Sequence, residues 1–272
     1  MNEAKRSPLE RPFPDVRTAF LLTIWTDVPV PNPLGFSHPG TVLWTRTYPR
    51  TQLQEHYVGC DYCTNLTQLE SAFEYVIDLP AGSEFSQTQG TIYWLSVAAI
   101  YSGAVPTNWW GWKTREHYYG DDAVRITAPL LPAMGSPFVS GSPVEYPTGV
   151  SWDAAFQLSV YAQSAPVTKW SQPPASWVPP DAFNGWNEVS AYGGPQLVAD
   201  DWVCVDGEAV SDVHWWGSFL GWGERTPPSD APNSFNITNF LTVNVKKPPF
   251  NDPRVRKALS LAIDRWGGIP SL

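Results

Sequence analysis

Positive charge is scarce in this chain. Its 272 residues include 17 Lys and Arg against 26 Asp and Glu, which gives a net charge of −9 at pH 7 and a pI near 4.8. Nucleic acids bind through basic residues that neutralise their phosphates, and no basic cluster occurs before Lys246. We therefore expect no nucleic-acid partner, whereas neutral polysaccharides and cations remain compatible with this charge.

Long apolar runs are missing as well. No stretch approaches the roughly 20 apolar residues that span a bilayer, so we expect no membrane insertion. The first residues, Met1–Pro8, are polar and lack the apolar segment and cleavage site of a signal peptide. Two interpretations follow: the chain is cytosolic, or it is a mature or truncated piece of a longer exported protein.

Cysteine is rare. Cys60 and Cys63 form a Cys-x-x-Cys pair in a segment with the composition of a loop, and Cys204 stands alone. A redox motif requires a strand before it and a helix after it, and a structural zinc site requires four ligands. Neither condition is met, so we expect a local Cys60–Cys63 disulfide or two free thiols.

Helical patterns are absent before residue 250. The 28 prolines and 20 glycines break the chain into short segments, because Pro interrupts helices and is excluded from strand interiors. Between the breaks, apolar residues alternate with polar ones, as in Ser71–Pro80 and Trp152–Gln163. Thr18–Asp27 and Gly90–Tyr101 are apolar on both faces, as central strands are. The pattern predicts an all-β fold, an antiparallel β-sandwich of jelly-roll character.

The last segment has a different pattern. Asp252–Trp266 places its apolar residues on one helical face, with Asp252 as N-cap, Pro253 in the first turn and Gly267 after the end. We expect a short basic helix appended to the sandwich. The expected parts are a disordered N-terminal segment (1–15), a main sandwich portion (16–165), a β portion that completes the sandwich or starts a second copy (166–238), and a strand with the basic helix (239–272).

Short aromatic and acidic segments recur along the β portion. They are Thr23-Ile-Trp-Thr-Asp-Val-Pro, Phe36-Ser-His-Pro-Gly, Gly90-Thr-Ile-Tyr-Trp-Leu, Gly111-Trp-Lys-Thr, Asp121-Asp-Ala-Val, Trp170-Ser-Gln-Pro-Pro, Ala199-Asp-Asp-Trp-Val-Cys and Asp212-Val-His-Trp-Trp-Gly-Ser. Together they cover about residues 16–238 and resemble a tryptophan-rich domain family of unknown function from secreted bacterial proteins. The resemblance implies an extracellular or cell-surface location, with the chain as part of an exported protein.

The order of these segments differs from the family's. There, the patterns found here at Trp170 and Asp212 precede the one found at Thr23. The chain is therefore either the end of one tandem copy followed by the start of the next, or one circularly permuted copy, which a sandwich with neighbouring termini tolerates. Residues 239–265 resemble a fragment of the peptide-binding protein of an ABC importer, which indicates a chimeric or frameshifted reading frame.

Tryptophan is unusually frequent, with 15 copies, and clusters at 109–112 and 214–222. Sugar rings stack on exposed aromatic planes, and a β-sandwich can present several such planes. Adjacent residues of a strand point to opposite faces, so at most one of each adjacent pair can join a given binding surface. We select Trp110, Trp112, Trp216 and Trp222 as candidate ligand-binding residues; the alternative for each ring is a place in the core.

Two aspartate pairs, Asp121-Asp122 and Asp200-Asp201, lie at expected strand starts. Calcium takes six to eight oxygen ligands, so these four residues form a candidate calcium site, with solvated carboxylates or turn caps as the alternative. Glycoside hydrolysis would need two carboxyl groups about 5–10 Å apart in a cleft. The chain has no Gly-x-Ser-x-Gly segment and no phosphate-binding glycine loop. We therefore expect no catalytic residues and no cofactor other than calcium.

These observations favour a non-catalytic extracellular module that binds a polysaccharide or another cell-surface component through exposed tryptophans. A purely structural domain of a tandem surface protein is the second interpretation, and a polysaccharide-active enzyme is the third. An oligopeptide-binding importer component ranks last, because most of the required cleft is absent from the chain.

Overall fold

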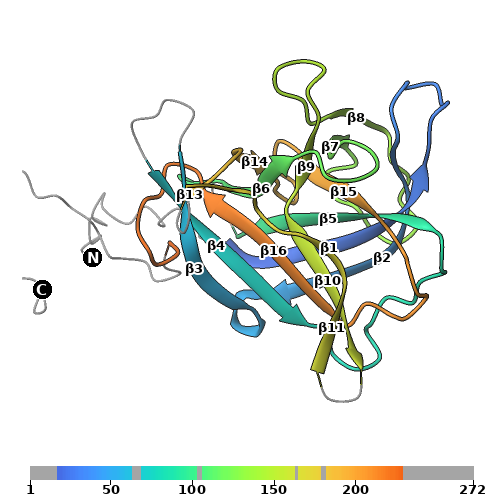
Figure 1. Cartoon of the computed structure of the whole chain (residues 1–272), viewed down its shortest axis with the longest axis horizontal. Helices are drawn as coiled ribbons and strands as arrows, with labels where there is room; N and C mark the ends of the chain where they lie inside the picture. The colour runs from blue at the N-terminus through green and yellow to red at the C-terminus, as the bar shows by residue number, and fades with distance from the viewer. Residues whose placement is uncertain (1–16, 63–68, 103–105, 163–164, 179–181, 229–272) are drawn as a thin grey trace, which may run out of the picture. The chain divides into compact units, whose positions relative to one another are not determined.

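The computed structural model describes residues 17–62, 69–102, 106–162, 165–178 and 182–228. Within these ranges the protein is all-β, with two sheets packed face to face (Figure 1). The predicted β-sandwich is confirmed, whereas its jelly-roll character stays a prediction. The expected N-terminal segment and C-terminal helix lie outside the described residues. The only helical segment in the described ranges is the short 3₁₀ turn η1 (Arg50–Gln52).

The first sheet has six antiparallel strands in the order β2-β1-β5-β15-β7-β8. They are β1 (Arg17–Val28), β2 (His38–Pro49), β5 (Ile92–Tyr101), β7 (Val124–Ala128), β8 (Ser140–Pro143) and β15 (Leu197–Val203). The two-sided apolar pattern correctly predicted that β1 and β5 are interior strands. On β1, Phe20 and Leu22 face the main core, while Leu21 and Trp25 join a smaller cluster with β7 and β15 residues.

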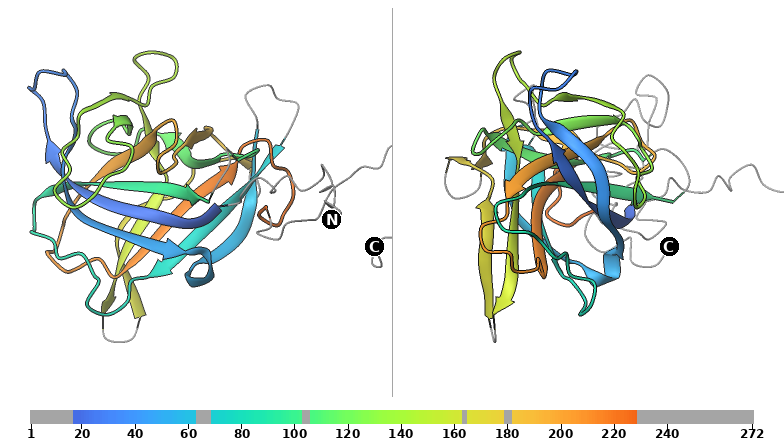
Figure 2. Two further views of the ribbon diagram at one scale, coloured as in Figure 1. Left: turned by 180° about the vertical axis from the view of Figure 1, so that it is seen from behind. Right: turned by 90° about the vertical axis from the view of Figure 1, so that its right-hand side faces the viewer.

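The second sheet follows the order β11-β10-β16-β4-β3-β13-β12, and β6 pairs with β16, β14 and β9. Its strands are β3 (Gln54–Tyr62), β4 (Leu69–Asp78), β6 (Trp110–Glu116), β9 (Trp152–Ala154), β10 (Phe156–Ala162), β11 (Ala165–Gln172), β12 (Ser176–Val178), β13 (Ala182–Phe183), β14 (Asn187–Val189) and β16 (Asp212–Phe219). The short β13 runs parallel to β3, unlike the other strand pairs. The two further views show this sheet crossing the first (Figure 2).

Strands from distant parts of the chain share both sheets. In the first sheet, β15 lies between β5 and β7; in the second, β16 lies between β10 and β4. Each of these two strands therefore pairs on both sides with strands that precede residue 165. The portions 16–165 and 166–228 thus contribute to the same sandwich.

The main core lies between the sheets and follows the predicted alternation. Phe73, Tyr75, Ile77 and Leu79 of the β4 segment are all buried in it, as period-two alternation required. Phe156 of β10 is buried in the same cluster. Side chains of alternating positions on facing strands thus fill the space between the two sheets.

A chain of charged contacts joins the two ends of the described region. The buried Arg17 guanidinium donates to Glu55 Oε1 (2.6 Å), and Arg50 donates to Oε2 of the same carboxylate (3.0 Å). A second nitrogen of Arg50 donates to the carbonyl of Pro228 (3.0 Å). The start of β1 and residue 228 are therefore linked through Glu55 and Arg50.

Among the described residues, no helix is long and apolar enough to cross a membrane.

Candidate functional site

The structure buries most of the tryptophans selected from the sequence. Trp110 and Trp112 are 0% exposed and Trp216 is 9% exposed, so the prediction that these rings are exposed is wrong. Trp222 is partly buried against the main core, and its Nε1 donates to the Thr226 carbonyl (2.7 Å). The reason is that β6 pairs with β16, which turns the alternating rings of Trp110 and Trp112 into the core.

The two aspartate pairs, by contrast, come together in space. Asp121 and Asp122 lie in the loop between β6 and β7, and Asp200 and Asp201 lie on β15. The backbone N–H of Asp121 donates to Asp201 Oδ1 (3.3 Å) across 80 positions of sequence. The loop carboxylates are half-buried, whereas Asp200 and Asp201 are each 1% exposed.

Asp153 of β9 and Asp200 hold the surrounding backbone in place. Asp153 Oδ2 accepts the N–H groups of Tyr118 (2.6 Å) and Tyr119 (3.1 Å), which fixes the loop after β6. Asp200 Oδ2 accepts the backbone N–H of Ala154 (2.8 Å) and the side-chain amide of Gln172 (2.6 Å). The Asp153 bonds orient the loop that carries Asp121 and Asp122, and the Asp200 bonds join β9 and β11 to β15.

Burial shifts the protonation of this cluster. It raises the pKa of Asp201 to about 8, and the negative charges of Asp121 and Asp153 act in the same direction. Burial also raises the pKa of Asp200 well above its ordinary range, helped by the charges of Asp153 and Asp201. The Asp201 carboxyl therefore holds a proton at neutral pH.

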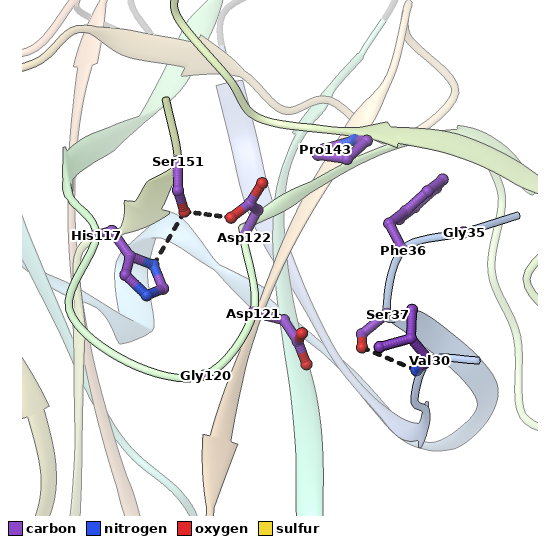
Figure 3. Close-up of a pocket in the computed structure, with 10 residues that line it drawn as sticks. All are labelled: Val30, Gly35, Phe36, Ser37, His117, Gly120, Asp121, Asp122, Pro143 and Ser151. Carbon is purple, nitrogen blue, oxygen red and sulfur yellow. Dashed lines mark hydrogen bonds between the residues drawn. The ribbon is translucent and has the colours of Figure 1, made fainter. Parts of the chain in front are cut away.

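A cavity of about 280 Å³ opens in front of the cluster. We call it the acidic pocket; its lining residues are Val30, Gly35, Phe36, Ser37, His117, Gly120, Asp121, Asp122, Pro143 and Ser151. Ser151 lies between His117 and Asp122 on one side, and Phe36 lies on the other (Figure 3). The Ser151 hydroxyl donates to Asp122, and His117 Nδ1 lies 2.9 Å from the same hydroxyl oxygen.

These side chains do not form a nucleophilic triad. A triad histidine uses one ring nitrogen for the serine and the other for the carboxylate. Here Nδ1 of His117 approaches both Ser151 (2.9 Å) and Asp153 Oδ1 (3.2 Å). Because the Ser151 hydroxyl donates its proton to Asp122, the arrangement presents hydrogen-bonding groups rather than an activated nucleophile.

Metal and disulfide predictions gain no support from the geometry. The described part of the chain contains no group of three or more His, Cys, Asp or Glu side chains placed to hold a metal ion, so the calcium site stays a prediction. Cys60 lies on β3, but Cys63 falls outside the described residues, and so does their predicted disulfide. Cys204 is buried, and its Sγ accepts the N–H of Gly207 (3.3 Å).

Sequence reasoning missed His117, Ser151 and Asp153. Each is a single polar residue outside any recognised motif, so no local sequence pattern identified it as a candidate site residue. Gln172 was part of the Trp170-Ser-Gln-Pro-Pro segment on which the family resemblance rests, and it now has a structural role as the amide that binds Asp200. Its own Oε1 accepts the Trp170 Nε1–H (2.7 Å), which fixes the orientation of the amide.

Comparison with known families gives a match over nearly the whole chain. A family described as "Domain of unknown function (DUF7901)" matches residues 2–159 and 168–260. No curated protein and no solved structure matches. The match includes most of residues 239–265, and nothing in it supports an importer fragment, a bacterial origin or a family defined by tryptophan. The chain belongs to the DUF7901 family of domains of unknown function.

Proposed function

We propose that the protein is a non-catalytic binding module that holds a sugar unit of an extracellular or cell-surface polysaccharide in the acidic pocket. The observation that carries this proposal is the lining of the pocket, where the carboxylates of Asp121 and Asp122 lie across from the half-buried ring of Phe36. This replaces the tryptophan surface expected from the sequence, since those rings are mostly buried.

The chemistry of the lining suits a hydroxyl-rich ligand. An ionised carboxylate accepts several hydrogen bonds, as neighbouring sugar hydroxyls require, and an aromatic ring packs against the C–H face of a sugar. The cavity of about 280 Å³ is slightly smaller than the range of about 300–1,000 Å³ typical of small-ligand sites. It therefore suits a single sugar ring rather than a long oligosaccharide.

The pocket is also pre-organised. Asp153 fixes the loop after β6 through two backbone bonds, and Oδ1 of the Asp201 carboxyl group accepts the N–H of Asp121. A ligand that binds here meets acceptors already held in position, which lowers the entropic cost of association. Asp201 itself is 1% exposed, which argues against a role as general acid in a polysaccharide-active enzyme, since a general acid must reach its substrate.

Binding to polysaccharides tests the proposal. We expect an insoluble polysaccharide from a broad panel to deplete the full chain from solution. The variants Asp122→Asn and Phe36→Ala should each weaken that binding by about tenfold, the size expected for a hydrogen bond to a charged group or a lost packing contact. Glu224→Gln removes the same charge at an exposed position outside the pocket and should leave binding unchanged.

A structural domain of a tandem surface protein is the second candidate. The burial of Trp110, Trp112 and Trp216 favours it, because Trp110 and Trp112 pack between the sheets, Trp216 is covered as well, and few aromatic side chains are left for a ligand. Under this alternative no polysaccharide retains the folded protein. Equal retention of wild type, Asp122→Asn and Phe36→Ala would also contradict the proposed pocket.

A further inference from the structure

A second polar cluster lies inside the second sheet and contributes nothing to the acidic pocket. Its members are Asp61 of β3, Glu70 of β4, Lys113 of β6 and Asn187 of β14, and all four are buried. Asp61 is 1% exposed and Lys113 is 0% exposed. Burying a lysine is costly unless its amine has a specific partner, so the contacts of Lys113 need an explanation.

The lysine amine faces one oxygen of a carboxyl group. Lys113 Nζ lies 2.9 Å from Asp61 Oδ1. Neither atom makes a hydrogen bond of normal geometry with any described residue, although both are fully buried. The other oxygen, Asp61 Oδ2, accepts the Asn187 side-chain amide (2.8 Å) and the Ser218 hydroxyl (3.3 Å). The carboxyl is thus held by one oxygen while the other is presented to the amine.

Glu70 completes the cluster. Its Oε2 accepts the same Asn187 amide group (3.2 Å), and its Oε1 accepts the backbone N–H of Gly221 (2.7 Å). Asp61 Oδ2 and Glu70 Oε2 accept from the same Asn187 nitrogen, so the two carboxyl groups lie close together. A second carboxyl group is therefore at hand to accept or return a proton.

The fold brings these strands together although β3 and β6 do not pair. Between them lie β4 and β16, but β13 pairs with β3 and the following β14 pairs with β6, with Asn187 opposite Lys113. Gly111 and Gly217 permit this close approach. A Cβ on Gly111 would lie 2.8 Å from Asn187 backbone, and one on Gly217 would lie 2.5 Å from the Gly111 carbonyl.

Burial moves both reacting groups towards their neutral forms. It lowers the pKa of Lys113, against the opposing effect of the Asp61 charge. It raises the pKa of Asp61, against the opposing effect of the Lys113 charge. A neutral amine is a nucleophile, and a neutral carboxylic acid can lose its hydroxyl group as water, so both shifts act in the direction of the reactive pair.

We propose that Lys113 and Asp61 join in an intramolecular isopeptide bond. The Nζ lone pair attacks Cγ of the protonated Asp61, and the C–N bond forms as the C–OH bond breaks. The amine gives up one hydrogen, the carboxyl gives up its hydroxyl, and one water molecule leaves. No oxidant or further reactant is needed. Glu70 takes the proton from the attacking nitrogen and returns it to the departing hydroxyl.

Mass spectrometry of the denatured full chain tests the bond. The expected mass is lower than that of the sequence by one water molecule. No Lys or Arg occurs between Thr51 and Trp112, so trypsin should yield the peptide 51–115 lacking one water, because it does not cut after an acylated lysine. Chymotryptic digestion should yield a branched peptide that contains both Asp61 and Lys113.

Variants separate this reaction from other losses of water. Lys113→Arg and Asp61→Ala should show the full mass of their sequences, and Glu70→Gln should leave unreacted chain. Asp61→Asn can still react, but with release of ammonia, and should reach the same final mass as the wild type. A wild-type chain of full mass that is cut after Lys113 overturns the proposal, as does a water loss that persists in Lys113→Arg. A bond mapped to Asn187 with loss of ammonia overturns the assignment to Asp61.

Discussion

Carboxyl groups behind the acidic pocket hold protons that exposed carboxyl groups would have lost. The ordinary pKa of an aspartate is about 3.9, whereas burial raises that of Asp201 to about 8. Between these two values the folded state binds a proton that the unfolded state has released. The free energy of unfolding therefore falls as the pH rises through this window, by up to about 1.4 kcal/mol per pH unit.

We predict that the variant Asp201→Asn flattens this dependence. Asparagine does not ionise, so the variant should lose less stability than the wild type between pH 5 and pH 8 and should be the more stable protein at pH 8. Thermal unfolding followed by circular dichroism at each pH measures the slope. Glu224→Gln should keep the wild-type slope, and an Asp201→Asn slope equal to that of the wild type would show that Asp201 does not hold the proton.

His214 adds a contribution of the same sign at higher pH. Burial lowers its pKa, but its contacts with Asp212 and Glu74 outweigh this and raise it from 6.5 to about 9. The stabilisation is complete below pH 6.5 and is lost as the pH rises to about 9. The variant His214→Gln should therefore reduce the pH dependence of the free energy of unfolding between pH 7 and pH 9, a range in which the effect of Asp201→Asn is smaller. Equal slopes of wild type and His214→Gln in that range would contradict this assignment.

Two buried tryptophans allow a matched test of a single hydrogen bond. Trp112 and Trp215 are both 0% exposed, but only Trp112 Nε1 has a partner among the described residues, the Ala155 carbonyl at 2.8 Å. Phenylalanine removes the same atoms at both positions. Trp112→Phe also breaks this bond and leaves the Ala155 carbonyl with only the longer contact from the Trp216 N–H (3.4 Å), so it should lower the free energy of unfolding by about 1–3 kcal/mol more than Trp215→Phe does in urea titrations. Equal losses would rule out a stabilising role for this bond.

At the scale of strands, the close packing of β6 beside β16 depends on the absence of a side chain at Gly217. A Cβ at Gly217 would lie 2.5 Å from the Gly111 carbonyl and 2.5 Å from the Trp110 ring. We predict that Gly217→Ala lowers the free energy of unfolding by about 1–3 kcal/mol through overpacking. Thr127→Ala on the exposed face of β7 should change it by about 0.5 kcal/mol or less. A Gly217→Ala protein as stable as the Thr127 variant would disprove the close packing.

Strands could be predicted from the sequence far better than the site could. Alternation marked β4 and the two-sided apolar runs marked β1 and β5, because these patterns depend on neighbours two positions apart. The same alternation cannot tell which face of β6 another strand covers, which is why Trp110 and Trp112 were expected at the surface. Asp121 and Asp201 are 80 positions apart in the sequence. Their contact depends on the pairing of β15 with β5 and β7, and no local sequence pattern encodes that pairing.

For the whole sandwich, cooperativity follows from the placement of β15 and β16. Without them β5 loses its pairing with β15, and β4 loses its pairing with β16. We predict one unfolding transition for the full chain, with coincident far-UV and near-UV circular dichroism curves. A chain that ends at residue 165 should give no near-UV signal, because its buried tryptophans lack a packed environment. A native-like near-UV spectrum of that fragment would show that it folds without the later strands.

The contacts around Glu55 determine how the sandwich would respond to tension. Arg17 contacts the Glu55 carboxylate, and the Pro228 carbonyl contacts Arg50, which binds the same carboxylate. Both ends of the described region therefore leave the sandwich on the same side. A force that pulls these two ends apart acts across the strands on that side of the sandwich rather than along their length. It would separate β1 from β2 and β5 stepwise, beginning at Arg17, so that the hydrogen bonds of both pairs break in succession and not all at once, as they would in a sheared sheet.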